Sequence, residues 1–537
     1  MVRALSVTAL GLLALLCWFT CEPVQAGKIL VTPMDGSHWL SLKILVEELS
    51  QRGHEVVVLV PETSILIGSS GNYITKSFAV PYTSAELNFN LNNVRKQALE
   101  KPPDIRSLFT NFGNLVKFVN LQVKGCEMLL YNETLMKSLG ETGFDALLSD
   151  PFLPCGTIIA QKFSLPTIYF LRGIPCRLDE AAAKCPSPPS FVPRFFTGYS
   201  DKMSFAQRIN NVIMTTVEPF LCQTMFATFD ELGSRYLKKD TTYKELLSHG
   251  AIWLLRYDFT LEYPKPIMPN IVQIGGINCA KRDPLSKELE EFVNGSGEHG
   301  FVVFTLGSMV SKLPEAKARV FFEAFKQIPQ RATDTDAVDL SFQFLPHPEP
   351  QAPEVFQRVS TRVSRPPRWM QGHPKVKAFI THGGSHGIYE GICNGVPMVM
   401  LPLFGDQGDN VQRLVSRGVA ESLSIYDLST EKLLVALKKV ISEKSYKEKM
   451  TKLSAIHRDR PIEPLDLAVF WTEFVMRHKG AEHLKPAAHE LNWIQYHSLD
   501  VIGFLLLILV TVIFVTVKSC MFCFRKCFRK TQKKKKE

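Results

Sequence analysis

The body of this chain lacks the basic surface that its formal net charge of +10 would suggest. Much of the excess positive charge lies in the C-terminal tail, and without that tail the chain is nearly balanced. The tail residues concerned are Arg525, Lys526, Arg529, Lys530 and Lys533 to Lys536. Proteins that bind nucleic acid need positive charge on a face or groove of the folded body. We therefore predict no nucleic-acid partner.

Cysteine is scarce in the body, although the whole chain has 12. Two cysteines lie in an apolar run at the N-terminus, and Cys520, Cys523 and Cys527 follow a second run near the C-terminus. The others are odd in number and widely spaced. In an oxidising compartment such a set predicts at most a few disulfides, and it excludes a small scaffold held by many bridges. A short internal repeat is also lacking.

Apolar runs mark both ends of the chain. Arg3 precedes the run from Ala4 to Cys21, and the small residues up to Ala26 offer a cleavage site, so residues 1–26 are predicted to be a secretory signal peptide. Residues 501–517 are continuously apolar and just long enough for a transmembrane helix. The basic residues in 518–537 place that tail in the cytosol by the positive-inside rule. The body is then lumenal.

Short motifs agree with a protein of the secretory pathway. The sequences "NET" at Asn132 and "NGS" at Asn294 are acceptors for N-linked glycans. The final "KKKE" resembles the dilysine signal that returns type I membrane proteins to the endoplasmic reticulum. We predict a single-pass type I protein of the endoplasmic reticulum membrane.

Two segments open with a strand, a loop and a helix. In "GKILVTPMDGSHWLSLKILVEELSQRGHEVVVLV" a strand begins at Lys28, a loop ends at Gly36-Ser37-His38, and an amphipathic helix leads to a strand at Glu55. A similar order restarts with "FVVFTL" at Phe301. This predicts an α/β chain with two doubly wound, Rossmann-like domains that face a cleft. We place them at 27–280 and 281–490.

The stretch "FITHGGSHGIYEGICNGVPMVMLPLFGDQGDN" predicts a βαβ unit with polar residues at its strand ends. His382, Gly383 and Gly384 follow the first strand, and Asp406 and Gln407 follow the second. Glycines and a helix N-terminus favour the binding of a phosphate group. The carboxylate of Asp406 and the amide of Gln407 can form hydrogen bonds with hydroxyl groups. Taken singly, the glycines could be ordinary turn residues and Asp406 a helix cap. Their order in one unit favours a ligand with phosphate at one end and hydroxyls at the other.

This stretch resembles the donor-sugar signature of the UDP-glycosyltransferases. A later one, "DRPIEPLDLAVFWTEFVMRHKGAEHLKPAAHELNWIQYHSLDVIGF", is similar to the vertebrate UDP-glucuronosyltransferases, particularly their first family. The resemblance covers nearly the whole chain. It implies a GT-B fold with an N-terminal acceptor domain and a C-terminal UDP-sugar domain, and no metal or cofactor besides the co-substrate UDP-glucuronate. It also implies inverting transfer of glucuronic acid to hydroxyl or similar groups of small lipophilic acceptors, and it leaves homo- or hetero-oligomers with related enzymes open.

A catalytic base is expected at His38, with Asp150 as its partner. A neutral histidine suits the removal of a hydroxyl proton if a carboxylate fixes its tautomer. His38 opens a helix after the first strand, and Asp150 ends a second strand in "FDALLSDPF", so both fall at strand C-termini. The resemblance assigns them the same roles. From the residues alone, His38 could instead cap its helix and Asp150 could open a turn.

Donor-binding roles also follow from the resemblance. It implies that His382 contacts the diphosphate, Glu390 the ribose, and Asp406 and Gln407 the sugar hydroxyls. From the residues, Ser308 follows a strand and can donate to a phosphate oxygen, and Gly384 lets the backbone approach the phosphate. Glu390 could otherwise lie on a solvated helix face. Arg256 in "WLLRYDF" is expected to contact the glucuronate carboxylate, with a surface salt bridge as the alternative. We expect apolar stretches such as "SFVPRFFTGY" to line the acceptor pocket.

One segment, 331–371, departs from the family pattern. The pattern predicts a strand with tryptophan-arginine and then "WLPQNDLLGHP", whose Trp and Gln hold the uracil. This chain instead has a Pro- and Arg-rich sequence that predicts a long loop. Trp369 and Gln371 are too close together to take the two roles, and a misassembled gene model or a divergent exon would each explain the segment. The alternatives are a catalytically impaired, membrane-anchored partner of active subunits, or a transferase that uses another UDP-sugar.

Overall fold

The computed structural model describes residues 26–87, 99, 105–195, 197–280, 285, 287–307, 310, 313–334 and 373–534. Four predicted features therefore lie wholly or partly outside the described residues: residues 1–25 of the signal peptide, Ser308, residues 335–371 of the atypical segment, and residues 535–537 of the basic tail.

The N-terminal half is built on a parallel sheet of seven strands in the order β3-β2-β1-β4-β5-β6-β7. Its two central strands, β1 and β4, mark the point where the strand order reverses, which is where open α/β sheets bind ligands. The strands are β1 (Lys28–Thr32), β2 (Glu55–Pro61), β3 (Ile74–Phe78), β4 (Ala146–Ser149), β5 (Thr167–Leu171), β6 (Ile252–Leu255) and β7 (Ile271–Gln273).

Helices cover both faces of this sheet, as parallel sheets require. Successive strand residues point to opposite faces, so Ile29 and Val31 pack in one core layer and Leu30 packs in the other. The first layer lies under α2 (Ser37–Gln51). The second lies under helices that include α4 (Ile105–Leu130), α5 (Glu133–Thr142), α6 (Cys155–Phe163), α7 (Leu178–Ala182), α8 (Phe205–Leu237) and α9 (Tyr243–Ser248), with the 3-10 turn η1 (Pro175–Arg177) beside them.

The C-terminal half repeats the plan with five parallel strands in the order β12-β11-β10-β8-β9. Here β8 and β10 flank the reversal point. The strands are β8 (Phe301–Thr305), β9 (Arg331–Asp334), β10 (Val376–Thr381), β11 (Met398–Met400) and β12 (Ala420–Ser422). The helices are α10 (Lys287–Asn294), α11 (Glu315–Phe325), α12 (Ser385–Cys393), α13 (Gln407–Val415), α14 (Thr430–Ser442) and α15 (Lys444–Arg458). The first four residues of the atypical segment thus form an edge strand rather than a loop.

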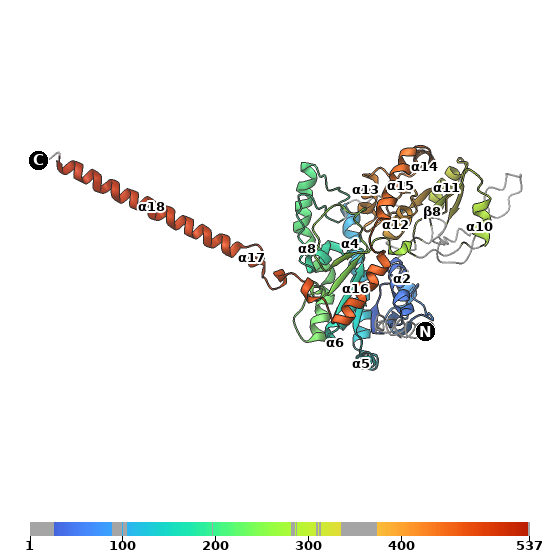
Figure 1. Cartoon of the computed structure of the whole chain (residues 1–537), viewed down its shortest axis with the longest axis horizontal. Helices are drawn as coiled ribbons and strands as arrows, with labels where there is room; N and C mark the ends of the chain where they lie inside the picture. The colour runs from blue at the N-terminus through green and yellow to red at the C-terminus, as the bar shows by residue number, and fades with distance from the viewer. Residues whose placement is uncertain are drawn as a thin grey trace, which may run out of the picture. The chain divides into compact units, whose positions relative to one another are not determined.

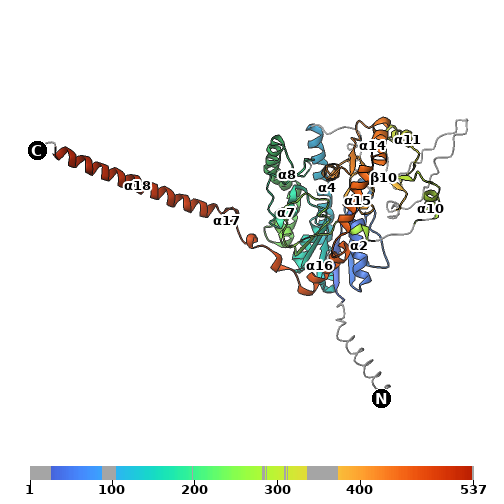
Figure 2. The same cartoon turned by 45° about the horizontal axis from the view of Figure 1, so that its top comes forward.

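The chain crosses between the halves more than once. Between β7 and β8 it passes through η2 (Ile277–Cys279), and the predicted boundary at 280/281 falls in this interval. After α15 it returns, and α16 (Pro464–His478) packs beside α2 on the N-terminal sheet (Figures 1 and 2). Arg52 pairs with Asp466 at 2.6 Å across this contact. The predicted domain 281–490 therefore contains a helix that belongs spatially to the first half.

Disulfides join Cys126 to Cys155, Cys176 to Cys222 and Cys279 to Cys393, which agrees with the small number expected. Among the described residues of the body, Cys185 is left as a free, buried thiol.

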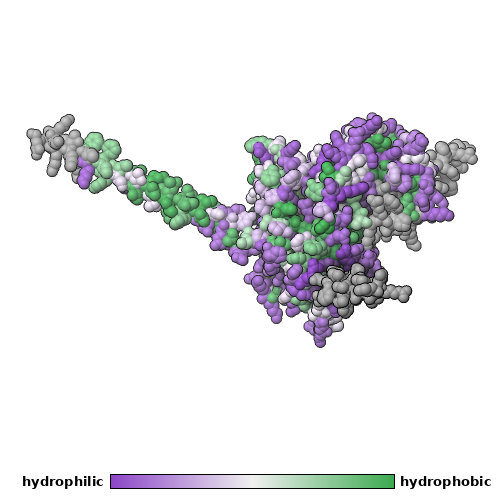
Figure 3. Space-filling view, in the orientation of Figure 1, coloured by the Kyte–Doolittle hydropathy of each residue, from purple (hydrophilic) through white to green (hydrophobic). Residues whose placement is uncertain are grey.

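Residues 485–537 form a separate unit. It contains η4 (Ala487–His489), α17 (Trp493–Tyr496) and α18 (Leu499–Lys534), while η3 (Glu482–Leu484) ends the preceding unit. The apolar part of α18, which contains the predicted 501–517, appears as a green rod in Figure 3 and is long and apolar enough to span a membrane. Helix α8 passes the same test, but Phe226 and Phe229 in its second half pack into the N-terminal core.

Candidate active site

The predicted base and its partner meet at the C-terminal edge of the first sheet. Strands β1 and β4 pair in register from Ile29–Ala146 to Thr32–Ser149, so the segments that follow them emerge side by side. His38 Nδ1 lies 2.6 Å from Asp150 Oδ2. Asp150 is buried, and the His38 side chain is 24% exposed. The other carboxylate oxygen, Oδ1, accepts a hydrogen bond from Phe152 N, so Asp150 also holds the turn that follows it.

This contact fixes the roles of the imidazole nitrogens. A carboxylate accepts hydrogen bonds, so Nδ1 of a neutral His38 carries the proton and donates it to Asp150. The lone pair of Nε2 is then available to take a proton from a bound hydroxyl. The arrangement is that of a histidine base oriented by a buried acid.

A third residue, Asp35, holds the loop before His38. Its carboxylate accepts hydrogen bonds from Ser64 Oγ at 2.8 Å and from Ile65 N at 2.6 Å, which ties the loop to the segment after β2. Gly36 has a φ of 78°, a conformation that favours glycine, and α2 begins immediately after it. Sequence reasoning missed Asp35, and the "DG" pair that precedes His38 was the available signal.

Two cavities flank this region. One reaches Asp150 and has mainly apolar walls that include Leu59, Phe78, Leu129 and Phe229. The other is lined by part of the "SFVPRFFTGY" stretch together with charged residues, and it reaches Asp406. The charged residues are Arg172, Arg177, Glu180, Arg194, Glu262, Lys265, Asp409 and Arg413. The stretch expected to line the acceptor pocket therefore lines the more polar of the two cavities.

His382 occupies the matching position in the second sheet, directly after β10. Its ring packs against two glycines: a Cβ at Gly307 or at Gly384 would lie 2.5 Å or 2.4 Å from a ring atom. The glycines therefore make room for this imidazole. Burial, with a smaller effect of the neighbouring His386, lowers the pKa of His382 to about 4 although Asp406 opposes the shift. The ring is neutral at physiological pH.

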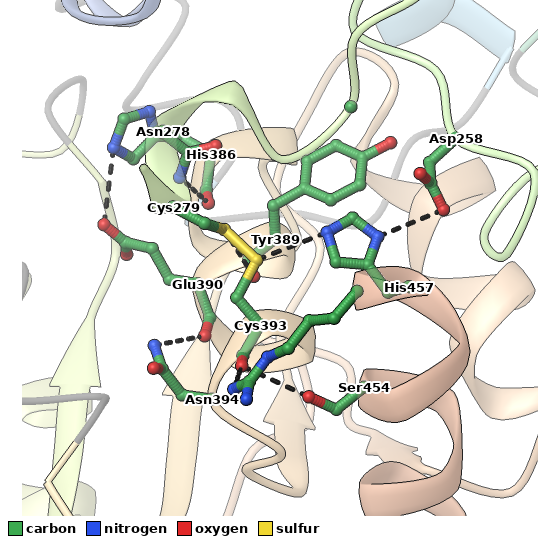
Figure 4. The surroundings of a disulfide bond; sticks show 12 residues. Asp258, Asn278, Cys279, His386, Tyr389, Glu390, Cys393, Asn394, Ser454 and His457 are labelled. Carbon is green, nitrogen blue, oxygen red and sulfur yellow. Dashed lines mark hydrogen bonds and ion pairs between the residues drawn. A yellow bond between two sulfur atoms is a disulfide. The ribbon is translucent and has the colours of Figure 1, made fainter. Parts of the chain in front are cut away.

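Helix α12 begins at Ser385, where the preceding Gly384 has no side chain to cap the first N–H groups. Such a helix end favours an anion. Glu390 lies on the same helix, is only 6% exposed, and pairs with His386 Nε2 at 3.3 Å, as Figure 4 shows. It is therefore not part of a solvated helix face.

Asp406 and Gln407 begin α13. Asp406 Oδ2 accepts a hydrogen bond from Asn410 Nδ2 at 2.8 Å and lies 3.7 Å from Arg172 Nε, so its carboxylate does not cap α13. Gln407 Oε1 accepts from Leu403 N and Phe404 N. The amide nitrogen of Gln407 is thus the group that can donate a hydrogen bond to a ligand hydroxyl. Sequence reasoning missed Arg172, because nothing local links "FLRGIP" to α13.

Arg256 follows β6 and is buried, which does not fit a surface salt bridge. Its Nη1 donates to Ser41 Oγ at 2.9 Å. Burial lowers the pKa of its guanidinium, while Asp150 and Asp406 raise it, so the arginine lies near both functional edges. Within the described part of the chain, its buried Nε has no hydrogen-bond partner.

Three further predictions concern glycans and metals. Asn132 and Asn294 are both exposed, the first as the N-cap of α5 and the second at the end of α10. Among the described residues, Cys279, Cys393 and His457 cluster closely enough to bind a metal ion. However, the two cysteines form a disulfide, with His457 Nε2 3.3 Å from Cys393 Sγ (Figure 4). Thiolate ligands are therefore not available there.

Comparisons with known proteins place this geometry in a family. The model described as "UDP-glucoronosyl and UDP-glucosyl transferase" matches residues 27–535. The chain is 48% identical to UDP-glucuronosyltransferase 1A1 of Rattus norvegicus over 519 residues (96% of this chain and 94% of the relative). It is 46% identical to UDP-glucuronosyltransferase 1A1 of Homo sapiens over 536 residues (98% and 96%).

Solved structures share the fold at low sequence identity. The glycotransferase of kitacinnamycin aligns with a TM-score of 0.58 at 14% identity, covering 84% of this chain and 99% of that chain. Os79 from O. sativa aligns with a TM-score of 0.55 at 14% identity, covering 83% and 100%. The first is a glycotransferase by its title, and the two parallel sheets of this chain have the GT-B arrangement. The chain belongs to the UDP-glucuronosyl and UDP-glucosyl transferase family.

Proposed function

We propose that this chain transfers glucuronic acid from UDP-glucuronate to hydroxyl or similar groups of small lipophilic acceptors. The observation that carries the proposal is the 2.6 Å contact between His38 and buried Asp150, in a chain 46–48% identical to named glucuronosyltransferases. No cofactor is required for such a transfer.

The chemistry runs as one displacement. His38 Nε2 takes the acceptor proton while the acceptor oxygen bonds to the anomeric carbon of the sugar. The bond from that carbon to the diphosphate oxygen breaks on the opposite face, so the configuration inverts. Asp150 keeps Nδ1–H in place and stabilises the imidazolium that forms. The leaving UDP carries the negative charge, which the N-terminus of α12 and the neutral His382 receive.

The donor and acceptor are assigned to opposite edges of the site. His382, Gly384 and Ser308 hold the diphosphate, Glu390 the ribose, and Asp406 with the Gln407 amide the sugar hydroxyls. Arg256, whose buried Nε is unpartnered in the described structure, receives the glucuronate carboxylate. The apolar cavity at Asp150 holds the acceptor.

We place the enzyme in the endoplasmic reticulum membrane. Helix α18 anchors it, the basic tail lies in the cytosol, and the body lies in the lumen, where Asn132 and Asn294 carry glycans. Lipophilic acceptors reach the body by partitioning into the same membrane. Homo- or hetero-oligomers with related enzymes are part of this proposal.

Microsomes that contain the full chain test the donor and the reaction together. We expect glucuronides of a panel of phenols with UDP-glucuronate, and at least a hundredfold less product from matched microsomes that carry His38→Ala, which is about the contribution of a general base. Wholesale preference for UDP-glucose or UDP-N-acetylglucosamine would overturn the donor assignment and leave the transferase.

A further inference from the structure

A chain of hydrogen bonds crosses from the N-terminal half to the donor helix. Arg256 Nη1 donates to Ser41 Oγ at 2.9 Å, and Ser41 Oγ lies 3.3 Å from His386 Nδ1. His386 Nε2 lies 3.3 Å from Glu390 Oε1. Ser41 is one turn beyond His38 on α2, and Glu390 is one turn beyond His386 on α12. The chain therefore connects the helix that bears the base to the residue assigned to the ribose.

With a neutral imidazole at His386, the chemistry of the end groups sets the direction of every bond in this chain. A guanidinium only donates and an ionised carboxylate only accepts. Ser41 therefore accepts from Arg256 and donates its hydroxyl proton to His386 Nδ1, and the Nε2–H of His386 donates to Glu390. The hydroxyl has a longer alternative, Ser37 O at 3.4 Å. A neutral imidazole satisfies both of its neighbours, and an apolar side chain at either position would break the connection.

Further contacts hold α12 to residues outside the second sheet, among them the Cys279–Cys393 disulfide between η2 and the end of α12. Asn278 Nδ2 donates to His386 O at 3.1 Å, a contact drawn in Figure 4. Tyr389 Oη donates to Arg256 O at 3.1 Å. The two outer residues of the connection are buried, Ser41 at 1% and Glu390 at 6% exposed, while the His386 side chain between them is 24% exposed. Helix α12 is thus positioned partly by the acceptor half.

We propose that Ser41 and His386 are positioning residues that form an interdomain latch and couple the donor contact of Glu390 to the base-bearing helix α2. The proposal rests on the proposed function, because it takes Glu390 as the ribose contact. Its consequence is that affinity for UDP depends on Ser41, a residue of the acceptor half. Loss of the Ser41 hydroxyl removes the hydrogen bond that orients the His386 ring, and the contact of that ring with Glu390 loses its fixed geometry.

The test is a titration of the purified full chain with UDP, followed by phosphorus NMR so that weak binding is measured. We expect Ser41→Ala and His386→Phe each to weaken UDP binding about tenfold, as for one hydrogen bond in a charged network. The double variant should be no weaker than either single variant, because both changes break the same connection. Ser41→Thr keeps the hydroxyl and should restore the affinity. Ser50→Ala, near the end of the same helix, is the matched control and should bind UDP as the unmodified chain does.

Thermal unfolding of each variant separates a latch from a general defect. A Ser41→Ala protein with unchanged UDP affinity, or single effects that multiply in the double variant, would overturn the latch. An unmodified chain that binds no UDP would overturn it as well. If the chain binds UDP with the expected dependence on Ser41 but transfers no glucuronic acid, the latch stands and the proposed function fails.

Discussion

His38 and Asp150 are positioned by neighbouring strands of one sheet, whereas the donor helix α12 is positioned partly by residues of the opposite half. The base and its acid are therefore fixed wherever the N-terminal sheet is folded. The donor contacts depend in addition on how the two halves meet. A change at the base should alter turnover and spare UDP, while changes around α12 should alter donor binding.

Replacing His38 by alanine should have the largest effect. We expect turnover of a phenol to fall by about a hundredfold to ten-thousandfold, the usual contribution of a general base, with UDP affinity unchanged. Steady-state kinetics and UDP titration on the same preparation measure both quantities. Turnover of His38→Ala at the unmodified rate would show that another group takes the proton.

Asp150→Asn should reduce turnover by as much as His38→Ala or by less. The amide keeps the shape but can donate to Nδ1, which favours the wrong imidazole tautomer and loses the charge that stabilises the imidazolium. Asp145→Asn is the matched control, because Asp145 precedes the same strand at its other end and pairs with Lys479. Equal losses in the two variants would indicate damage to β4 rather than loss of the acid.

The strands were predictable from the sequence, because strands buried on both faces leave continuous apolar runs. The runs "KILV", "ALL" and "FVVFT" all form strands. The C-termini of parallel strands meet at one edge, so His38 and Asp150 could be paired before any contact was known. The Ser41–His386 contact and the Arg172–Asp406 pair were not predictable. They join residues more than two hundred positions apart across an interface whose geometry no local pattern determines.

The atypical segment sharpens the comparison on the donor side. The comparison protein carries a family-like "WLPQ" segment in place of residues 331–371. If the uracil contacts are missing, the chain as written should bind UDP on the order of a hundredfold more weakly than this protein, because base–aromatic stacking contributes about 1–3 kcal/mol. Calorimetric titration of the two proteins with UDP measures the ratio of their affinities. Equal affinities would remove the only support for a catalytically impaired partner of active subunits.

The smallest expected effect concerns pH and His382. Its pKa in the folded protein is about 4, below the ordinary value of 6.5, so between these values the unfolded chain binds a proton that the folded chain does not. Stability therefore falls as the pH is lowered from 6.5 toward 4. His382→Gln removes this titration, and the difference between the two proteins should be on the order of 1–2 kcal/mol in the middle of the window.

Thermal unfolding midpoints of both proteins, measured from neutral pH down to this window, give the difference directly. Carboxylates with lowered pKa values, such as Asp258 and Glu262, lose their stabilising charge as the pH falls in both proteins, so their contribution cancels. Parallel curves for the unmodified chain and His382→Gln would mean that His382 is as free to take a proton in the folded protein as in the unfolded chain. That outcome would conflict with a ring held between Gly307 and Gly384, and it would weaken the assignment of a neutral imidazole to the diphosphate.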